Sequence, residues 1–441
     1  MIDMIYIAQS DIQQAQPVSI EKKATTLEQS GLMHSKAAGR FEIVKALPKK
    51  ADSFDGMFDY ADAFGKFRFA YINTTHRVSN NPKDTKNALS LGGEFGFNTA
   101  SYYDFSLHVS AFVSQKVPAL NPSAKNINGD FFDVNSASFV YLGEASLDYN
   151  SEMFQTKIGR VRVDTPYANS DDVRMAPNTF QGAWANIEYT PTLKTQLLYF
   201  DKWAGSDSQD EATSASQNDF KNLVAQENFG MFGASLTYEY AQNSQMSFWY
   251  NYIDGMAAIA YAEIVGIYFV NDDFHMDYGV QFSDISELDN SNVDGDVLGA
   301  MAIMHYKGAF FGGAYNASYS DKGEAVTDGF GGGPYYTSLD EATISAISES
   351  AASLGTSQTN NAEAFRIGAG YEFDNNALKG LVFELVYGEL YTQNVKIKEK
   401  DVVLTYDITD KWYGEFIYTN YDSSYNHDTF NRALVRIDYS F

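Results

Sequence analysis

The chain ends on ALVRIDYSF, residues 433–441, and the alternation of side chains in this stretch indicates the fold. One row of side chains is apolar and consists of Ala433, Val435, Ile437, Tyr439 and Phe441. The row between them is polar at Arg436, Asp438 and Ser440. Successive side chains of a strand point to opposite faces, so this period of two predicts a strand with one apolar and one wet face.

The same period of two recurs along the chain from Gly65 onward, in segments of about ten residues. In one of them the pattern predicts Phe139 and Tyr141 on the apolar row with Leu147, opposite Glu144. About eighteen such segments occur, and each has the roughly 9–11 residues of a tilted membrane strand. Clear examples are GKFRFAYINT at 65–74, DFSLHVSAFV at 104–113, SFVYLGEASLDY at 138–149 and FHMDYGVQFS at 274–283.

The connections between these segments alternate in length. Short ones such as YNSEM, AQNSQ and VNDD stand at every second junction, with mostly long ones between them and one exception near Ile253. Bacterial outer-membrane barrels have short periplasmic turns and long external loops, whereas a soluble sandwich has no reason to sort its loops. Aromatic side chains also cluster at both segment ends, as in the interfacial girdles of a barrel. The sequence therefore predicts an all-β fold, a transmembrane antiparallel β-barrel of about 18 strands.

Composition narrows the function classes. The 441 residues carry a formal net charge of −26 and no cysteine. The negative charge argues against a nucleic-acid partner, and the lack of cysteine excludes disulfides and thiolate metal sites. No apolar run approaches the roughly 20 residues of a membrane-spanning helix. Residues 1–63 lack the period of two, so we predict a partly helical or flexible periplasmic extension there, before a barrel at 64–441.

IGRVRVDTPYANSDDVRMAPNTFQG, residues 158–182, is the connection that says most about function. It has no long apolar run to bury, and folded into the lumen it would narrow the pore and set a field there. The alternative is an ordinary solvated external loop. Within the predicted constriction loop, 161–181, the charges have both signs and stand at Arg162, Asp164, Asp171, Asp172 and Arg174.

Two regions resemble the OprD-type outer-membrane porins. One region resembles the family's signature in and just after the third external loop, the loop that folds inward as the constriction, through Pro166, Asp172, Arg174, Pro177, Thr179, Phe180 and Gly182. The other region is similar to the late loop and the next strand pair of the family, and consists of PYYTSLDEATISAI at 334–347 and AFRIGAGYEFDNNALKGLVFELVYG at 364–388. The acidic character and the N-terminal extension are similar to the epsilonproteobacterial major outer-membrane porins. The resemblance implies an eighteen-stranded, often trimeric barrel in the bacterial outer membrane.

The side chains expected to face the lumen carry both charges, and those we single out are Arg68, Glu144, Asp148, Arg160, Arg366 and Arg436. Relatives that admit amino acids or aromatic acids line the lumen with basic residues, but an acidic mouth concentrates cations and repels anions. We therefore expect an aqueous channel for passive diffusion of ions and small hydrophilic solutes that prefers cations.

Two alternatives stay open. One is a substrate-selective channel for small charged metabolites or peptides, guided by Arg68, Arg160 and Arg436. The other is a surface barrel with a mainly adhesive or structural role, acting through the loops at 203–228 and 321–362. The six histidines show no HExxH or paired spacing, and no nucleophile motif lies near them, so the sequence predicts no enzyme and no cofactor.

The remaining expectations concern ions and partners. Asp171 and Asp172 are candidates for binding a structural divalent cation such as calcium, without the spacing of a dedicated calcium loop. The expected partners are outer-membrane lipid and lipopolysaccharide, small hydrophilic solutes and two further copies of the chain in a homotrimer. The ending with Tyr439 and Phe441 also resembles the signal that the barrel-assembly machinery recognises in its clients.

Overall fold

The computed structural model of the chain describes residues 49–441 except 80, 210–215, 225–228, 341, 343–360, 376 and 393–394. Eighteen antiparallel strands form one continuous sheet. Their bounds are β1 Asp62–Arg77, β2 Asp84–Asn98, β3 Phe105–Lys116, β4 Phe139–Asn150, β5 Phe154–Val161, β8 Thr179–Thr190, β9 Leu193–Ala204, β11 Met231–Ala241, β12 Ser244–Ile253, β13 Ala257–Asn271, β14 Phe274–Glu287, β15 Gly295–Tyr306, β16 Ala309–Tyr319, β17 Ala362–Glu372, β18 Leu381–Tyr391, β19 Lys396–Asp407, β20 Trp412–Ser423 and β21 Asp428–Ser440.

Shorter elements lie in the connections. A two-residue strand, β10, pairs with β9 at the margin of the sheet, and β6 pairs with β7 in a separate hairpin. Their bounds are β6 Asp164–Thr165, β7 Ala168–Asn169, β10 Lys221–Asn222, α2 Phe54–Asp59, and the 3-10 helices η1 Ala124–Asn126, η2 Gly129–Phe131, η3 Val134–Ser136, η4 Ser206–Ser208 and η5 Tyr425–His427. Among the described residues, no helix is both long and apolar enough to cross a membrane.

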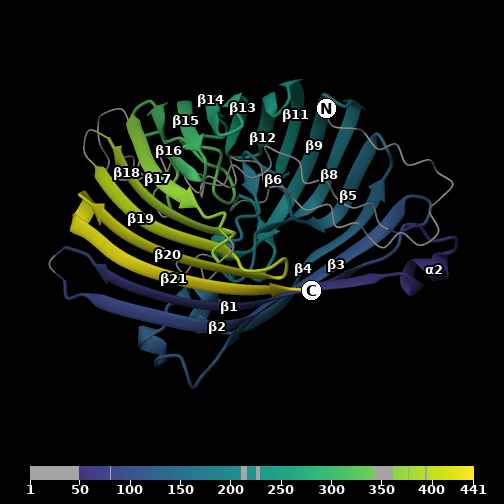
Figure 1. Ribbon diagram of the computed structural model, residues 1–441, viewed down its shortest axis with the longest axis horizontal. Helices are drawn as coiled ribbons and strands as arrows, with labels where there is room; N and C mark the ends of the chain where they lie inside the picture. The colour runs from purple at the N-terminus through teal and green to yellow at the C-terminus, as the bar shows by residue number, and fades with distance from the viewer. Residues whose placement is uncertain are drawn as a thin grey trace.

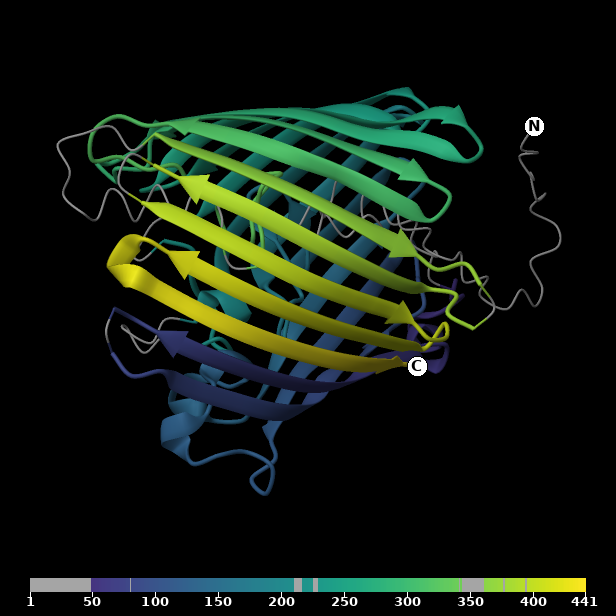
Figure 2. The same cartoon turned by 60° about the vertical axis from the view of Figure 1, so that its left-hand side comes forward.

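The last strand closes the barrel against the first. β21 pairs with β1 over twelve positions, and the register sets Asp438 opposite Arg68 and Arg436 opposite Ala70. Figure 2 shows the two strands side by side, with the C-terminus at the rim of the tight turns. Closure removes both sheet edges, so the backbone groups of these strands find partners within the sheet. The predicted barrel of about 18 strands, closed by ALVRIDYSF, is confirmed.

The connections sort by length as predicted. The tight turns, such as the one between β13 and β14, lie at the rim near the C-terminus. The opposite rim carries the longer connections, including those after β3, β5, β9 and β16. Short links occur there as well, after β12 at 254–256 and between β20 and β21 around η5.

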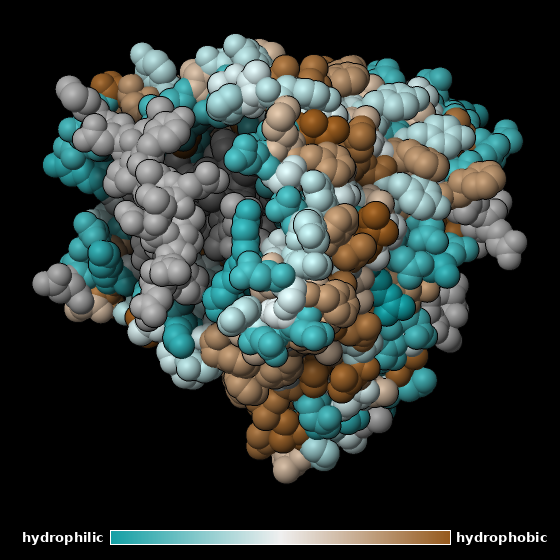
Figure 3. All heavy atoms as spheres, turned by 90° about the vertical axis from the view of Figure 1, so that its right-hand side faces the viewer, coloured by the Kyte–Doolittle hydropathy of each residue, from teal (hydrophilic) through white to brown (hydrophobic). Residues whose placement is uncertain are grey.

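Alternation along the strands separates an apolar outer wall from an inner face that carries charged side chains on some strands and apolar side chains on others, such as β15. In β21, Leu434, Arg436 and Asp438 are buried inside, whereas Val435 and Ile437 point outward. On the face viewed in Figure 3, apolar side chains gather in a broad band with hydrophilic side chains around its margins. An outward apolar band is what lipid requires, and the inner face is free to carry charge.

Strand β4 departs from the predicted pattern. Ser110 of β3 pairs with Glu144, but the next residue, Ala111, pairs with Leu142, so Gly143 is left over as a bulge. One extra residue reverses the face to which each preceding side chain of the strand points. Phe139 is therefore buried inside, at 3% exposure, and Leu142 faces outward. The prediction that Phe139 and Tyr141 share the outer row with Leu147 was wrong, because a period of two does not reveal a bulge.

The described part of the N-terminal region lies at the rim of the tight turns. Ser53 caps α2 by accepting a hydrogen bond from the Gly56 amide at 3.0 Å. Ala51 and Met57 then hydrogen-bond through their backbones to the β2–β3 turn at residues 100–101, at 2.7 and 2.9 Å. Residues 1–48 of the predicted extension lie outside the described residues.

Candidate channel constriction

The connection at residues 162–178 enters the lumen as a compact hairpin. Its strands β6 and β7 pair through Asp164 with Asn169 and Thr165 with Ala168, which leaves Pro166 and Tyr167 at the tip. Proline fixes the backbone of the turn, and the Thr165 hydroxyl donates to the Ala168 carbonyl at 3.0 Å. In Figure 1, β6 lies inside the ring of strands. This loop is therefore ordered by its own hydrogen bonds before it meets the wall.

The tip of the loop contacts the wall at β13 and β14. The Tyr167 hydroxyl lies 2.6 Å from the Ser283 hydroxyl of β14 and 3.2 Å from the Tyr335 hydroxyl. Its ring meets that of Tyr261 in β13 edge-on, with the centroids 6.0 Å apart. Tyr167 is fully buried, and burial raises its pKa to about 12. The ring is a neutral anchor at physiological pH.

The other end of the loop contacts β1 and β21. Arg68 donates to the two carboxylate oxygens of Asp172 at 2.6 and 3.1 Å, and Lys66 donates to the same carboxylate at 2.6 Å. Arg68 also donates to Asp438 at 2.9 and 2.7 Å, and Arg436 donates to the Asp172 carbonyl. The loop thus contacts β1 and β21 at one end and β13 and β14 at the other, and it crosses the lumen between them.

The charge of Asp172 is set by these partners. Burial alone would raise its pKa, but the positive charges of Arg68 and Lys66 outweigh burial and hold the pKa of this carboxyl well below its usual range. Asp172 is therefore ionised at neutral pH. Each charge-assisted hydrogen bond contributes about 1.5–3 kcal/mol, so this cluster is the strongest attachment of the loop to the wall that we identify.

A second external connection, after β16, lines the lumen beside the first. The Tyr336 hydroxyl donates to Glu263 of β13 at 2.7 Å, and Arg366 of β17 donates to the Ser338 carbonyl at 2.6 Å. Asp340 pairs with Arg432 of β21. Two loops from different parts of the chain therefore meet inside one barrel, and both are attached to it through charged or phenolic side chains.

Two cavities lie along the wall formed by β17 to β21, β1 and β2. The first, of about 370 Å³, is lined by residues that include His76, Asp130 and Arg432. The second, of about 260 Å³, is lined by residues that include Asp340 and Arg436. Because Arg432 lines one cavity and its ion-pair partner Asp340 lines the other, the pair lies where the cavities adjoin.

Comparison with known proteins agrees with this geometry. A sequence profile of outer membrane porins of the OprD family matches residues 142–406, more than half of the chain. The chain belongs to the OprD family of outer membrane porins. It is therefore a channel protein of the bacterial outer membrane and not an enzyme, and its tight turns face the periplasm. The likeness to the epsilonproteobacterial branch stays a prediction.

Solved porin structures share the fold at low sequence identity. OpdK from Pseudomonas aeruginosa, solved with vanillate, has a TM-score of 0.71 and 16% identity, over 87% of this chain and 99% of OpdK. OccAB2 from Acinetobacter baumannii has a TM-score of 0.70 and 16% identity, over 88% of this chain and 99% of OccAB2. A comparison with curated protein sequences gave no match. The structural likeness shows the fold alone.

The predicted constriction residues all lie in the inward-folded hairpin or at its base. Arg162 pairs with Glu94 and Glu144 at 2.9 and 3.1 Å, at the point where the chain leaves β5. Asp164 accepts from the Ser170 amide at 3.0 Å and so closes the hairpin.

The two remaining charges lie beside Asp172. The Asp171 amide donates to the side chain of Asn169 at 2.9 Å. Arg174 lies 3.8 Å from Asp130. Burial would lower its pKa, but the negative charges of Asp130, Asp340 and other nearby carboxylates together outweigh burial and raise it.

Of the predicted lumen-facing charges, Arg160 is placed wrongly. It shares the outward row of β5 with Ile158, which is 57% exposed, and it donates to the Leu142 carbonyl at 2.9 Å. The positions that do lie on the inner face are Arg68, Glu144, Asp148, Arg366 and Arg436. Arg160 is therefore removed from the proposed arginine track, which keeps Arg68 and Arg436.

The contacts of Asp172 do not favour the calcium hypothesis for the Asp171–Asp172 pair, which stays a prediction. Arg68 and Lys66 already occupy both carboxylate oxygens of Asp172, and a metal ion there would have to displace two positive groups. The backbone of Asp171 is left-handed, with φ at 39°.

The sequence analysis did not predict the role of several residues of the constriction. Lys66 precedes Arg68 by two positions, so the period of two placed it on the inner row and its role was predictable in principle. Asp340 and Tyr167 lie in loops, where no periodicity shows the direction of a side chain. Glu415, which pairs with Arg436 at 2.5 Å, was visible only as one of many inner-row carboxylates.

Proposed function

We propose that this OprD-family porin conducts ions and small hydrophilic solutes passively and prefers cations. One observation carries the preference: carboxylates outnumber lysine and arginine side chains around both cavities. Four carboxylates and two arginines line the 260 Å³ cavity, and three carboxylates and two basic groups line the 370 Å³ cavity. In a lumen of low dielectric, an excess of one sign raises the local concentration of the opposite ion.

Reversal potentials in a planar bilayer under a salt gradient test this proposal. Asp130 lines the 370 Å³ cavity, and its side chain is 41% exposed and therefore open to solutes. We expect Asp130→Asn to move the reversal potential toward that of a non-selective pore. The matched control is Asp289→Asn, which removes the same charge from an exposed external loop. Anion preference of the unmodified channel would overturn the proposal.

A second candidate, a channel selective for small charged metabolites or peptides, is favoured by arginines at the same cavities. Arg366 and Arg436 line the 260 Å³ cavity together with Asp340 and Glu415. A zwitterionic solute there would meet positive and negative side chains at once. The OpdK structure named above was solved with vanillate, a carboxylate. Liposome-swelling rates decide between the two functions. A selective channel is favoured if the uptake rate of a zwitterionic peptide saturates with its concentration while that of a neutral sugar of equal size does not.

We also propose that the porin forms a homotrimer in contact with outer-membrane lipid and lipopolysaccharide, as its resemblance to often trimeric porins suggests. Chemical crosslinking in outer-membrane fragments tests the trimer, and a monomer alone would contradict it. The adhesive alternative rests on loops of which 210–215, 225–228, 341 and 343–360 lie outside the described residues. Single-channel conductance counts against it.

A further inference from the structure

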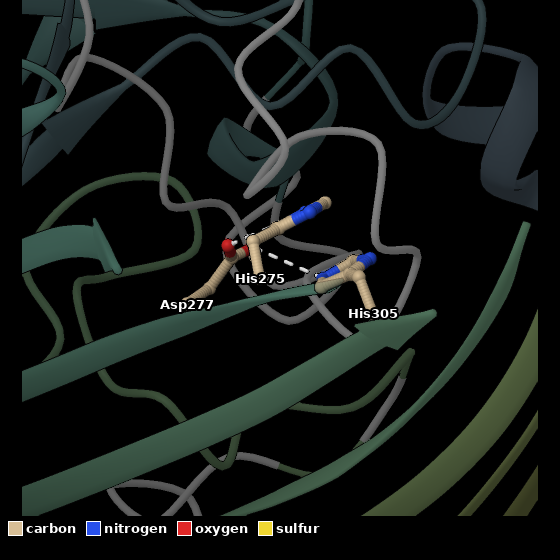
Figure 4. A group of neighbouring side chains, drawn as sticks. All are labelled: His275, Asp277 and His305. Atoms are coloured by element: carbon tan, nitrogen blue, oxygen red, sulfur yellow. Dashed lines mark ion pairs between the residues drawn. The ribbon is translucent and has the colours of Figure 1, made fainter. Parts of the chain in front are cut away.

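Strands β14 and β15 bring two histidines and an aspartate together on the inner wall. His275 and His305 are directly opposite in the antiparallel register, and Asp277 follows His275 by two positions on the same face. The three residues lie next to the turns at 271–274 and 306–309, near the periplasmic rim and away from the constriction loop. Figure 4 shows the three side chains converging from the two neighbouring strands.

The distances in this cluster suit a shared ligand. The Nε2 atom of His305 lies 3.2 Å from one carboxylate oxygen of Asp277, and that of His275 lies 4.0 Å from the other. One ligand atom from each residue lies within 4.8 Å of the other two. Two ligands that each stand about 2.1 Å from one ion are at most about 4.2 Å apart, so small side-chain rotations suffice to bind.

The cluster also lacks the compensation that buried charge requires. Asp277 is fully buried, and within the described residues neither of its carboxylate oxygens has a hydrogen-bond partner. The Nε2 atoms of His275 and His305 likewise have none. In the described part of the chain, the ion pairs of Asp277 are with these two histidines alone, and they form only when an imidazole is protonated. A buried carboxylate without hydrogen bonds is costly, and a bound cation would remove that cost.

The donor set indicates which cation. Two imidazole nitrogens and one carboxylate oxygen are ligands of first-row transition metals, and zinc sites with three protein ligands keep a further position open. The side chains of His275 and His305 are 20% and 12% exposed, so an ion in the lumen reaches them while Asp277 stays covered. The rings of Phe269 and Phe310 lie 5.5 and 5.9 Å from the two imidazoles and limit other access.

We propose that His275, Asp277 and His305 form a binding site for a divalent transition-metal ion on the inner wall of the barrel, with Zn²⁺ as the probe. The bound ion adds two positive charges to a lumen wall whose carboxylate is otherwise uncompensated. It therefore lowers the attraction of the periplasmic vestibule for cations, and lumenal Zn²⁺ acts as a regulator of ion flow.

Isothermal titration of the full chain, folded in detergent, with Zn²⁺ at pH 7.5 tests the site. We expect one Zn²⁺ per chain, and at least about a tenfold loss of affinity in His305→Ala and Asp277→Asn, because even the loss of a supporting residue behind a ligand costs 10–100-fold. His427→Ala is the control, since it removes an exposed imidazole outside the cluster. His305→Gln, which keeps the side-chain volume, replaces His305→Ala if that variant does not fold.

Each outcome is decisive. Binding that disappears in the cluster variants and persists in the control supports the site. X-ray absorption at the zinc edge must then show two imidazole ligands. No binding to the folded chain, or equal binding in the unmodified chain and in both cluster variants, overturns the proposal. Since this readout is binding, it is independent of the ion preference proposed above.

Discussion

Asp172 is the residue on which the position of the constriction loop depends most. Its carboxylate accepts from Arg68 and Lys66, and its carbonyl accepts from Arg436, so one residue connects the loop to β1 and β21. At the other end of the loop, Tyr167 contributes neutral hydrogen bonds, which are worth less. The ion pairs therefore decide whether the β1 side of the lumen is narrow.

Replacing Asp172 by asparagine is expected to enlarge the pore. The substitution weakens charge-assisted hydrogen bonds worth about 1.5–3 kcal/mol each and leaves Lys66 without its closest acid, while Arg68 keeps Asp438. Single-channel recordings should show higher conductance and more frequent transitions between levels. Asp289→Asn should behave as the unmodified channel does. Unchanged conductance in Asp172→Asn would mean that the loop does not limit flow.

The same charges predict how the channel responds to acid. Burial would raise the pKa of Asp172 and of Asp340, but the positive charges of Arg68 and Arg432 respectively outweigh it and lower both. A carboxyl whose pKa is depressed by folding stabilises the folded loop above its unfolded pKa, near 3.8, and loses that contribution as the pH falls through the folded value.

The part of the conductance that depends on Asp172, corrected for proton current, should therefore stay constant from about pH 7 to about pH 4 and rise only below that. Planar-bilayer recordings across this range measure it. A rise between pH 7 and pH 5 that occurs in the unmodified channel and is absent in Asp172→Asn would contradict the assignment, because Asp172 would then titrate within that range.

At the scale of a strand, the outer face of β15 must remain apolar. Ala300 lies near the middle of the strand, is exposed, and pairs with Val280 on the outer wall of β14. We expect Ala300→Arg to reduce the free energy of unfolding by about 2–4 kcal/mol, since a charge near the membrane midplane loses its hydration. Urea titration in lipid vesicles measures the change. Ala300→Leu should be neutral or stabilising, and an equal loss in both variants would indicate a steric cause.

The strands were predictable from sequence because one physical rule, the alternation of faces, repeats in each of them. Strand β21 obeys this rule throughout, and the rule correctly placed Arg436 and Asp438 inside. The rule fails where the chain departs from regular pairing, as at Gly143 in β4. A bulge shifts the facing of the residues beside it without a change of residue type, so the apolar–polar pattern of the sequence does not reveal it. At Arg160 the rule holds, since alternation sets this residue on the outward row with Ile158, and the prediction that it faces the lumen did not follow the rule.

The partners inside the lumen were not predictable for a different reason. The contact of Asp172 with Arg68 joins residues 104 positions apart, and that of Asp340 with Arg432 joins residues 92 apart. Both depend on how a loop crosses the lumen, which no local pattern encodes. The His275, Asp277 and His305 cluster is intermediate, because the β14–β15 pairing brings it together and the sequence shows only a His-x-Asp stretch.

At the scale of the whole molecule, the barrel closes where its two ends meet. The Phe441 amide donates to the Gly65 carbonyl at 3.0 Å, and the Gly65 amide donates to the Phe441 carbonyl at 3.2 Å. The ring of Phe441 is 46% exposed and lies 5.5 Å from that of Phe67. A Cβ at Gly65 would come within 2.5 Å of the Phe441 ring and 2.9 Å of the Glu94 carbonyl oxygen, so a larger residue would shift the ring and crowd the β2 backbone.

An exposed aromatic ring at the end of the closing strand is available to a partner before the barrel closes. Deleting Phe441 removes two of the many backbone hydrogen bonds of the β1–β21 seam, a small part of its stability. We therefore expect the deletion to reduce the amount of assembled porin in the outer membrane while leaving the conductance of each assembled channel unchanged. Phe441→Tyr, which keeps the ring, should assemble normally. Unassisted refolding in detergent separates the causes: if the deletion slows refolding as much as it reduces assembly in cells, Phe441 acts through the stability of the seam, and the proposal that the assembly machinery recognises it is wrong.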